Sequence, residues 1–336
     1  MPASPWLTLI VPGIAASLAQ CAQQGNSSRE LARVAGRGSL ACKWDRRGNE
    51  DADLLPWQRG LLAALNLSSD DFASAPITAY GSDRARSGEF WLQVEPVHLA
   101  AGLDHLTLLP LQGQAAVEPQ ERDALFEVLA GHLQAGDATL CRLIDASWSL
   151  HCGQQLDVET VCPPAAAARE LERAMPRGRG AGTLRRWMTE WQMLLHEHPV
   201  NNRRLQRGLP AINAVWPWGA GRLGDRIAAR RLPEAFGGDL YLHGIYALHG
   251  QEVSRLPGAV EELVDEVQGM ARAVCVNQAA DLNEWQERWL VPALKALSAR
   301  RLARLDLILD GWYLPLDRAV LRRFWRKPLP PAEWLA

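Results

Sequence analysis

The residues of this chain best suited to hold an anion lie between positions 198 and 221. Residues 198–204 read His-Pro-Val-Asn-Asn-Arg-Arg, and guanidinium groups bind phosphate or carboxylate through paired hydrogen bonds. The run 219–221, Gly-Ala-Gly, follows a stretch typical of a buried strand, and α/β proteins bind ligands at the carboxyl ends of strands. We therefore expect an anion-binding cleft here. The residues expected to line it are His98, Asn201, Arg204, Asn213, Gly219 and Gly221.

Each residue type has a task in this predicted cleft. Arg204 pairs with the anion, the amides of Asn201 and Asn213 orient it, and Gly219 and Gly221 allow the backbone to approach it closely. The alternative interpretation of the same residues is a solvated loop that binds nothing.

A second glycine-rich segment, residues 178–183, leads into an expected helix whose free N–H groups would favour phosphate. It does not follow a strand and lacks the lysine of a phosphate-binding loop, so a linker is the favoured interpretation. We expect residues 176–182 to form an internal hinge within a single domain that spans residues 1–336.

Local motifs for metal binding or nucleophilic catalysis are missing from the sequence. His196 and His198 are two residues apart on an expected helix, so their side chains point ~200° apart and cannot hold one ion. There is no H-E-x-x-H helix, calcium loop or G-x-S-x-G elbow. The six cysteines show no C-x-x-C spacing and are expected to be free thiols. We expect no catalytic residue, no metal and no cofactor.

The composition is that of a globular protein with a sizeable core. Of 336 residues, 48% are hydrophobic and 22% are charged, and the net charge of −2 argues against a function dominated by nucleic acid or anionic lipid. No apolar run reaches 18 residues, which excludes a transmembrane helix, so we expect a cytoplasmic protein without nucleic-acid or membrane partners. Residues 322–327, Arg-Arg-Phe-Trp-Arg-Lys, are basic and aromatic, but a solvated edge segment is favoured over nucleic-acid binding.

The elements that must position the cleft follow from apolar periodicity and turn signals. The pattern predicts a buried first strand at 6–11, a helix at 14–23, a long helix at 183–198 and a hairpin around Asp310-Gly311. The remaining expectations are strands at 90–94, 106–111, 139–144, 147–151, 209–218 and 239–248, and helices at 57–65, 119–134, 163–173, 257–276 and 281–299. Together they predict an α/β protein.

Three longer blocks carry a family resemblance. Residues 91–99, 191–201 and 209–221 resemble sequence blocks of proteobacterial regulatory proteins of the RpfE type, and Arg323-Phe324-Trp325-Arg326 also fits. The blocks are dispersed, so the resemblance spans nearly the whole chain. It implies a regulatory protein rather than a characterised enzyme.

More remotely, the order of residues between 198 and 221 is similar to archaeal-type cofactor-independent phosphoglycerate mutases, of the alkaline phosphatase-like superfamily. This resemblance implies an α/β sandwich with a central, mostly parallel sheet flanked by helices, with room for a smaller subdomain. It also implies an ancestor with two divalent ions and a Ser or Thr nucleophile. The sequence departs from that pattern, because residues 240–316 hold no Asp-His pair and residues 6–13 offer no Asp ligand.

The leading hypothesis is therefore a non-catalytic regulatory or sensing protein on a degenerate phosphoglycerate-mutase-like scaffold. It binds a small phosphorylated or carboxylated metabolite, and it can also act through a protein partner. The rival hypothesis is an active metal-dependent phosphomutase or phosphohydrolase with rearranged ligands. A third is a protein-interaction module that uses exposed tryptophans, of which the chain has fourteen in total.

Overall fold

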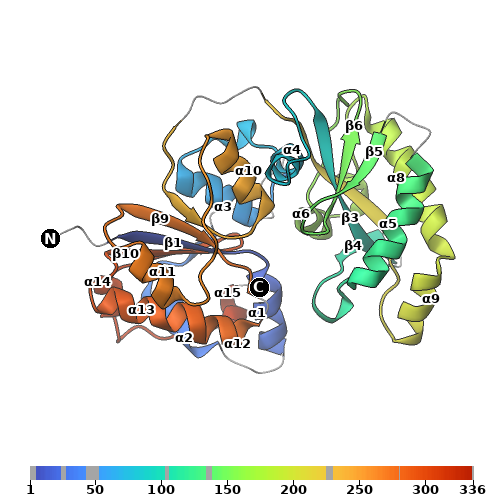
Figure 1. The fold of residues 1–336 in the computed structure, drawn as a ribbon. Helices are drawn as coiled ribbons and strands as arrows, with labels where there is room; N and C mark the ends of the chain where they lie inside the picture. The colour runs from blue at the N-terminus through green and yellow to red at the C-terminus, as the bar shows by residue number, and fades with distance from the viewer. Residues whose placement is uncertain are drawn as a thin grey trace. The chain divides into compact units, whose positions relative to one another are not determined.

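The computed structural model describes residues 5–23, 28–42, 53–102, 106–133, 138–224, 230–279 and 281–334. The contacts within the chain gather into two compact units. Unit 1 comprises Met1–Asp45, Pro56–Ser68 and Ala229–Ala336, and unit 2 comprises Arg46–Leu55 and Ser69–Ala228 (Figure 1).

Unit 1 is built on a six-stranded, mostly parallel sheet with the strand order β2-β11-β10-β1-β9-β8. The four strands from β10 to β8 are parallel, and β11 and β2 add an antiparallel edge. The strands are β1 (Trp6–Val11), β2 (Ala41–Cys42), β8 (Glu234–Phe236), β9 (Arg272–Val276), β10 (Arg304–Leu309) and β11 (Trp312–Leu316). This confirms the predicted α/β class with a mostly parallel central sheet.

Continuous apolar runs such as β1 form the centre of this sheet because both of its faces are covered by helices. Figure 1 shows α3 and α10 on one face and α2, α11, α12 and α13 on the other. The helices of unit 1 are α1 (Ile14–Gln23), α2 (Arg29–Arg37), α3 (Pro56–Leu65), α10 (Leu240–Leu248), α11 (Val260–Glu266), α12 (Leu282–Trp285), α13 (Val291–Ser298), α14 (Arg318–Leu321) and α15 (Pro331–Trp334). A π-helical turn, Gln286–Leu290, joins α12 to α13.

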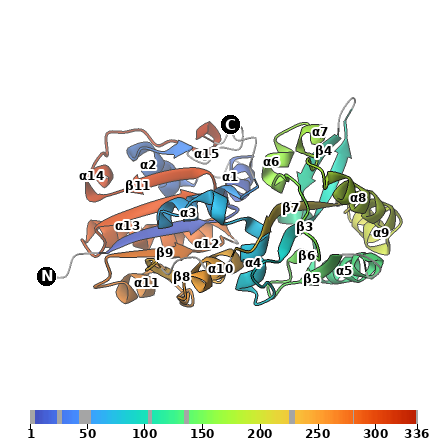
Figure 2. The same cartoon turned by 90° about the horizontal axis from the view of Figure 1, so that it is seen from above.

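Unit 2 contains an antiparallel sheet of five strands. The order is β4-β3-β6-β5, and β7 also pairs with the long strand β3. The strands are β3 (Phe90–Ala101), β4 (Leu106–Pro110), β5 (Ala138–Arg142), β6 (Trp148–Cys152) and β7 (Ala214–Arg222). The helices are α4 (Ser74–Gly81), α5 (Pro119–Leu133), α6 (Pro163–Ala167), α7 (Leu171–Ala174), α8 (Ala181–His196) and α9 (Pro199–Gln206), which Figure 2 shows from above. Short 3₁₀ turns lie at Ser69–Asp71 and Gly113–Ala115.

Two predicted elements are wrong, each for a local reason. Residues 239–248, expected as a strand, form α10 because the Asp239 carboxylate accepts two backbone N–H bonds of the first helical turn, at 2.9 and 3.1 Å. Residues 257–276, expected as one helix, divide into α11 and β9. Gly269 adopts a φ of +88° between them, which ends the helix.

The tryptophans mostly build the interior. Of the thirteen that the structure describes, ten are buried, Trp6 and Trp312 are half-buried and Trp325 is exposed. The described rings therefore give little support to the hypothesis of a broad tryptophan-based interaction surface. Within the described ranges, no helix has both the length and the apolar character needed to cross a bilayer.

Candidate functional site

The predicted cleft residues on β3 and just before β7 hold the two strands in register. The Nδ1 atom of His98 lies 2.8 Å from the carbonyl oxygen of Ala211. The Asn213 amide accepts from the backbone N–H of Leu99 at 2.7 Å and donates to its carbonyl at 2.9 Å. The Asn213 side chain thus extends the hydrogen-bonded ladder between β3 and β7 by two bonds to the Leu99 backbone.

Asn201 braces the segment between α8 and β7 from inside. Its Nδ2 atom donates to the carbonyls of Leu195 and Ile212, at 2.8 and 2.9 Å, and its Oδ1 accepts the Ile212 N–H at 2.7 Å. The side chain is buried. All three contacts are within the protein, as expected of a buried amide.

Arg204 is fully buried, with 0% exposure, and its guanidinium is held by protein groups. Its Nη1 donates to Glu121 Oε2 at 2.6 Å, its Nε to the Pro210 carbonyl at 2.8 Å and its Nη2 to the Ala115 carbonyl at 2.6 Å. The counterion that we expected from a ligand is supplied by Glu121 of α5. The structure therefore shows Arg204 bracing the protein, and its contact with a ligand stays a prediction that requires this cluster to open.

The backbone at Gly219 is hydrogen-bonded to a carboxylate that belongs to the protein itself. The backbone N–H of Gly219 donates to Asp53 Oδ1 at 2.6 Å. The Thr160 hydroxyl lies 2.8 and 2.7 Å from the two Asp53 oxygens and accepts the Ala220 N–H at 3.3 Å. Gly221 has another reason to be glycine, since a Cβ there would collide with the side chain of Ala73. The glycine run thus anchors the Asp53–Thr160 pair.

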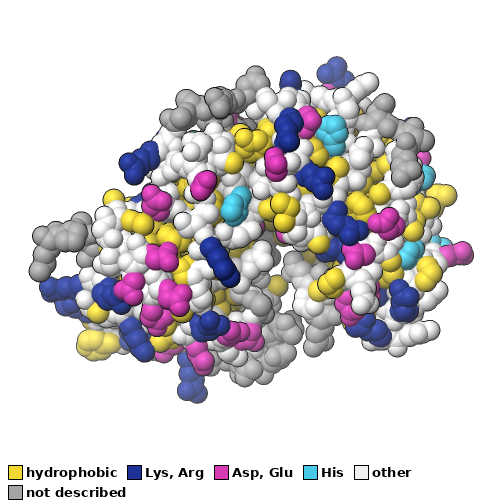
Figure 3. Space-filling model, viewed as in Figure 1, with side chains coloured by type: hydrophobic (Ala, Val, Ile, Leu, Met, Phe, Trp, Pro, Cys, Tyr) yellow, Lys and Arg dark blue, Asp and Glu magenta, His cyan; other side chains and the backbone are white. Residues whose placement is uncertain are grey.

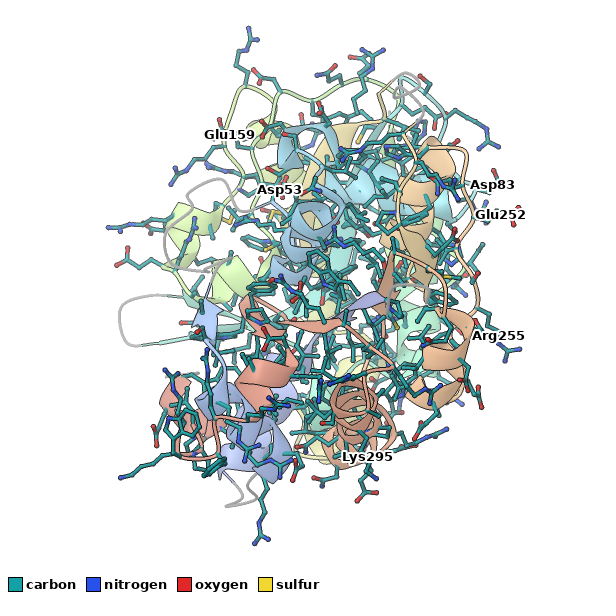
Figure 4. The ribbon with its side chains drawn as sticks, turned by 90° about the vertical axis from the view of Figure 1, so that its left-hand side faces the viewer. Asp53, Asp83, Glu159, Glu252, Arg255 and Lys295 are labelled. Carbon is teal, nitrogen blue, oxygen red and sulfur yellow. The ribbon has the colours of Figure 1, made fainter. Side chains whose placement is uncertain are left out.

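This pair lines a cavity of about 420 Å³ in unit 2, which we call the unit 2 pocket. Its lining residues are Asp53, Val158, Glu159, Thr160, Val161, Arg173, Met175 and Arg177. The guanidinium groups of two arginines and the carboxylates of Asp53 and Glu159 are among these residues, and Figure 4 labels the two carboxylates. The Arg173 partner is the exposed Glu170, at 3.2 Å, so its guanidinium is readily available to a stronger ligand.

Sequence reasoning missed these pocket residues. Residues 176–182, the predicted hinge, lie in unit 2, where the backbones of Arg177 and Glu159 exchange two hydrogen bonds at 2.9 and 3.0 Å. Asp53 had no predicted role. The available signal was the pair of arginines four residues apart, at 173 and 177, which the linker interpretation left unused.

A smaller cavity of about 170 Å³ lies directly after β9, at the carboxyl end of the parallel strands of unit 1. We call it the unit 1 pocket; it is lined by Asn277, Gln278, Ala279, Asp281, Glu284, Trp285, Arg288 and Trp289. Its carboxylates already have partners, because Asp281 accepts the Glu284 N–H at 2.8 Å and Glu284 pairs with Arg288 at 2.8 Å.

The neighbouring strand ends offer no obvious metal ligands. Asp310, at the β10–β11 turn, accepts the backbone N–H groups of Gly13 and Ala15, each at 2.8 Å, and so occupies the start of α1 with a carboxylate of the protein itself. In the ranges that the structure describes, no three His, Cys, Asp or Glu side chains gather closely enough to hold a metal ion. The donors present there do not fit the two-ion centre that the mutase resemblance implies.

One half-buried carboxyl on β3, that of Glu95, leads to a pH-dependent prediction. Burial raises the pKa of Glu95 on β3, and the charge of Arg122 offsets only part of that rise. A raised pKa in the folded state gives stability that is present below the unfolded-state pKa of about 4.3 and is lost as the pH rises through the folded-state value. We expect Glu95→Gln to increase the free energy of unfolding at neutral pH, with the gain disappearing in acid.

Denaturant titrations between pH 4 and pH 8 measure this effect. Glu127→Gln is the matched control, since the Glu127 side chain is 78% exposed. A Glu95→Gln difference that does not change with pH contradicts the assignment.

The sequence of this chain is similar to those of 2,3-bisphosphoglycerate-independent phosphoglycerate mutases. The enzyme of Methanosarcina barkeri (strain Fusaro / DSM 804) is 26% identical over 163 residues, which are 47% of this chain and 41% of that protein. That of Methanothrix thermoacetophila is 34% identical over 98 residues, covering 29% of this chain and 22% of that protein. A probable mutase of Geobacter sulfurreducens is 32% identical over 112 residues, which are 33% of this chain and 23% of that protein. In each case the match covers less than half of the relative.

No family model matches the chain. Among solved structures, the cofactor-independent phosphoglycerate mutase from Thermoplasma acidophilum aligns with 93% of this chain and 90% of its own, at 16% identity and a TM-score of 0.38. The PH0037 protein from Pyrococcus horikoshii aligns with 93% of this chain over 87% of its own length, at 13% identity and a TM-score of 0.45. The chain is thus a remote sequence relative of cofactor-independent phosphoglycerate mutases.

Proposed function

We propose that this chain is a cytoplasmic, non-catalytic regulatory or sensing protein of the RpfE type that binds a small phosphorylated or carboxylated metabolite. The observation that carries the proposal is the unit 2 pocket, with Arg173 and Arg177 in the wall that also contains Asp53 and Thr160. In this proposal the ligand lies next to Asp53, which the Gly219 N–H of β7 positions, rather than on Arg204. Signalling then passes to a protein partner.

The chemistry of the pocket selects the ligand class. Its volume of about 420 Å³ falls within the ~300–1,000 Å³ of small-molecule sites. Guanidinium groups bind phosphate and carboxylate, and the exposed carboxylate of Glu159 can accept a hydroxyl hydrogen. A small hydroxylated acid or its phosphate ester combines both requirements. Phosphoglycerate, the compound in the names of the relatives, belongs to this class.

Calorimetric titration with 3-phosphoglycerate and with inorganic phosphate tests the proposal. We expect the wild-type chain to bind and Arg177→Ala to bind about tenfold or more weakly, because a hydrogen bond to a charged group contributes about 1.5–3 kcal/mol. Arg179→Ala is the matched control: Arg179 is 92% exposed, pairs with Asp157 and does not line the pocket. Equal affinity of the Arg177 variant, or no binding by the wild type, contradicts the proposal.

The unit 1 pocket favours a second candidate function, a metal-dependent phosphomutase or phosphohydrolase. It lies at the carboxyl end of β9, the usual place of α/β active sites, and contains the carboxylates of Asp281 and Glu284. Turnover of phosphoglycerate or p-nitrophenyl phosphate with added Mn²⁺ or Zn²⁺ tests this candidate. The control is Glu287→Gln, since Glu287 is exposed and lies outside the pocket. If activity is lost in Asp281→Asn and kept in Glu287→Gln, the enzyme function is supported and the sensing proposal is contradicted.

A further inference from the structure

A basic and aromatic turn follows α14 in unit 1, and we call residues 322–327 the aromatic turn. Phe324 is 78% exposed and Trp325 is 69% exposed, and Trp325 is the exposed one among the thirteen described tryptophans. Their ring centroids lie 5.4 Å apart in an edge-to-face contact. Because exposed large rings are uncommon on a soluble surface, such a pair indicates a contact site. The proposed ligand pocket of unit 2 does not involve this turn.

The aromatic turn has an ordered backbone. Within it, the Arg326 N–H bonds to the Arg323 carbonyl at 3.1 Å, and the Phe324 N–H bonds to the Arg322 carbonyl at 2.8 Å. The next residues are fastened to α2, where the Leu329 N–H reaches the carbonyl of Ala32 at 2.8 Å. A turn that is already ordered loses little conformational entropy when its rings enter a partner.

The charges of the turn are also available to a partner. In the part of the chain that the structure describes, Arg322, Arg323, Arg326 and Lys327 make no ion pair with a carboxylate, although Arg326 donates to the carbonyl of Gly38 at 3.4 Å. Four cations within six residues therefore form a local positive site on a chain whose net charge is −2. Figure 3 shows hydrophobic and basic side chains together on the side of unit 1 where α14 lies.

We propose that the aromatic turn docks unit 1 reversibly onto an anionic lipid surface. Phe324 and Trp325 enter the boundary between headgroups and acyl chains, where aromatic rings are favoured. The neighbouring cations interact with lipid phosphates and carboxylates, and each contributes about a fivefold increase in binding. The sequence alone favoured a solvated edge; the observed exposure of both rings changes that assessment.

The geometry favours lipid over the other partners. Single-stranded nucleic acid is bound by a basic groove that follows several nucleotides and by open ring faces. Here the rings contact each other edge to face, and the cations are confined to six residues. A stable protein interface buries about 800 Å² on each side and draws on ~20–30 residues, far more than this turn provides.

Vesicle co-sedimentation tests the proposal with the whole chain. We expect binding to vesicles of equal parts phosphatidylcholine and phosphatidylglycerol, weak binding to phosphatidylcholine alone, and release by high salt. The double variants Phe324→Ser/Trp325→Ser and Arg322→Gln/Lys327→Gln are expected to lose most of this binding, the second by roughly 25-fold. Ile144→Ser is the control, because Ile144 is 77% exposed in unit 2.

Three outcomes overturn the proposal. These are equal binding to neutral and anionic vesicles, unchanged binding of both double variants, and a preference for poly(U) over vesicles that depends on the same residues. We expect the variants to fold because the altered side chains are exposed. Circular dichroism checks this.

Discussion

Replacing Arg204 by Met is expected to lower the free energy of unfolding by about 3 kcal/mol, because the buried Glu121 carboxylate loses its main partner. It keeps only the Glu118 N–H, at 3.0 Å, and the more distant Arg207, at 4.0 Å. The Arg204–Glu121 pair is enclosed, with side-chain exposures of 0% and 7%. Arg204 also holds the carbonyls of Pro210 and Ala115, so the variant loses those hydrogen bonds too. Guanidinium chloride unfolding, followed by circular dichroism, measures the change.

The matched control is Arg203→Met, which removes an exposed cation from the same helix and should change stability by less than ~0.5 kcal/mol. The double variant Arg204→Met/Glu121→Gln should recover part of the loss, since it no longer buries a carboxylate that has lost its main partner. A small effect of Arg204→Met, together with loss of metabolite binding, would support the prediction that Arg204 contacts the ligand.

The second large effect is expected for Gly219→Ala, at about 2–5 kcal/mol of lost stability. Gly219 has a φ of +68°, which costs a residue with a Cβ about 1–2 kcal/mol. Its Cβ would also lie 2.9 Å from the Ser74 Cβ and 3.2 Å from the Ala75 nitrogen, and such overpacking adds about 1–3 kcal/mol. The same denaturant titration measures the sum.

Gly208→Ala separates the two contributions. Gly208 has a similar φ of +70°, but nothing lies within 4 Å of the place that a Cβ would take there, so only the backbone cost applies. Equal losses of stability in the two alanine variants would show that α4 shifts to make room for the methyl group at position 219. The unit 2 pocket should also change in Gly219→Ala alone, because the Gly219 N–H positions Asp53.

Local signals predicted the bounds of some elements of unit 1, although the strands that pair with β1 are distant in the sequence. The apolar run 6–11 gives β1 with the predicted bounds, and Asp310-Gly311 gives the predicted hairpin, with Asp310 at a φ of +51°. The prediction of a strand at 239–248 failed because the local pattern was ambiguous. Its residues are apolar on every side, so periodicity could not distinguish a buried helix from a strand, and the decisive signal was the capping carboxylate of Asp239.

The candidate site depended on contacts that local reasoning does not reach. Glu121, the partner of Arg204, is 83 positions away, and Thr160, the partner of Asp53, is 107 positions away. The sequence located polar groups near Gly219, but not which of them satisfy one another. The arginines at 173 and 177, which line the unit 2 pocket, have only exposed partners in the described residues, namely Glu170 and the Arg173 carbonyl.

Gly36, in the last turn of α2, has a consequence for the far end of the chain. A Cβ at this position would collide with the carbonyl oxygen of Lys327, so the polypeptide after the aromatic turn crosses the helix at its bare backbone. Glycine weakens a helix by roughly 1 kcal/mol relative to alanine, and main-chain proximity accounts for its presence here. The close approach of the end of the aromatic turn to α2 therefore depends on a missing methyl group almost three hundred residues earlier.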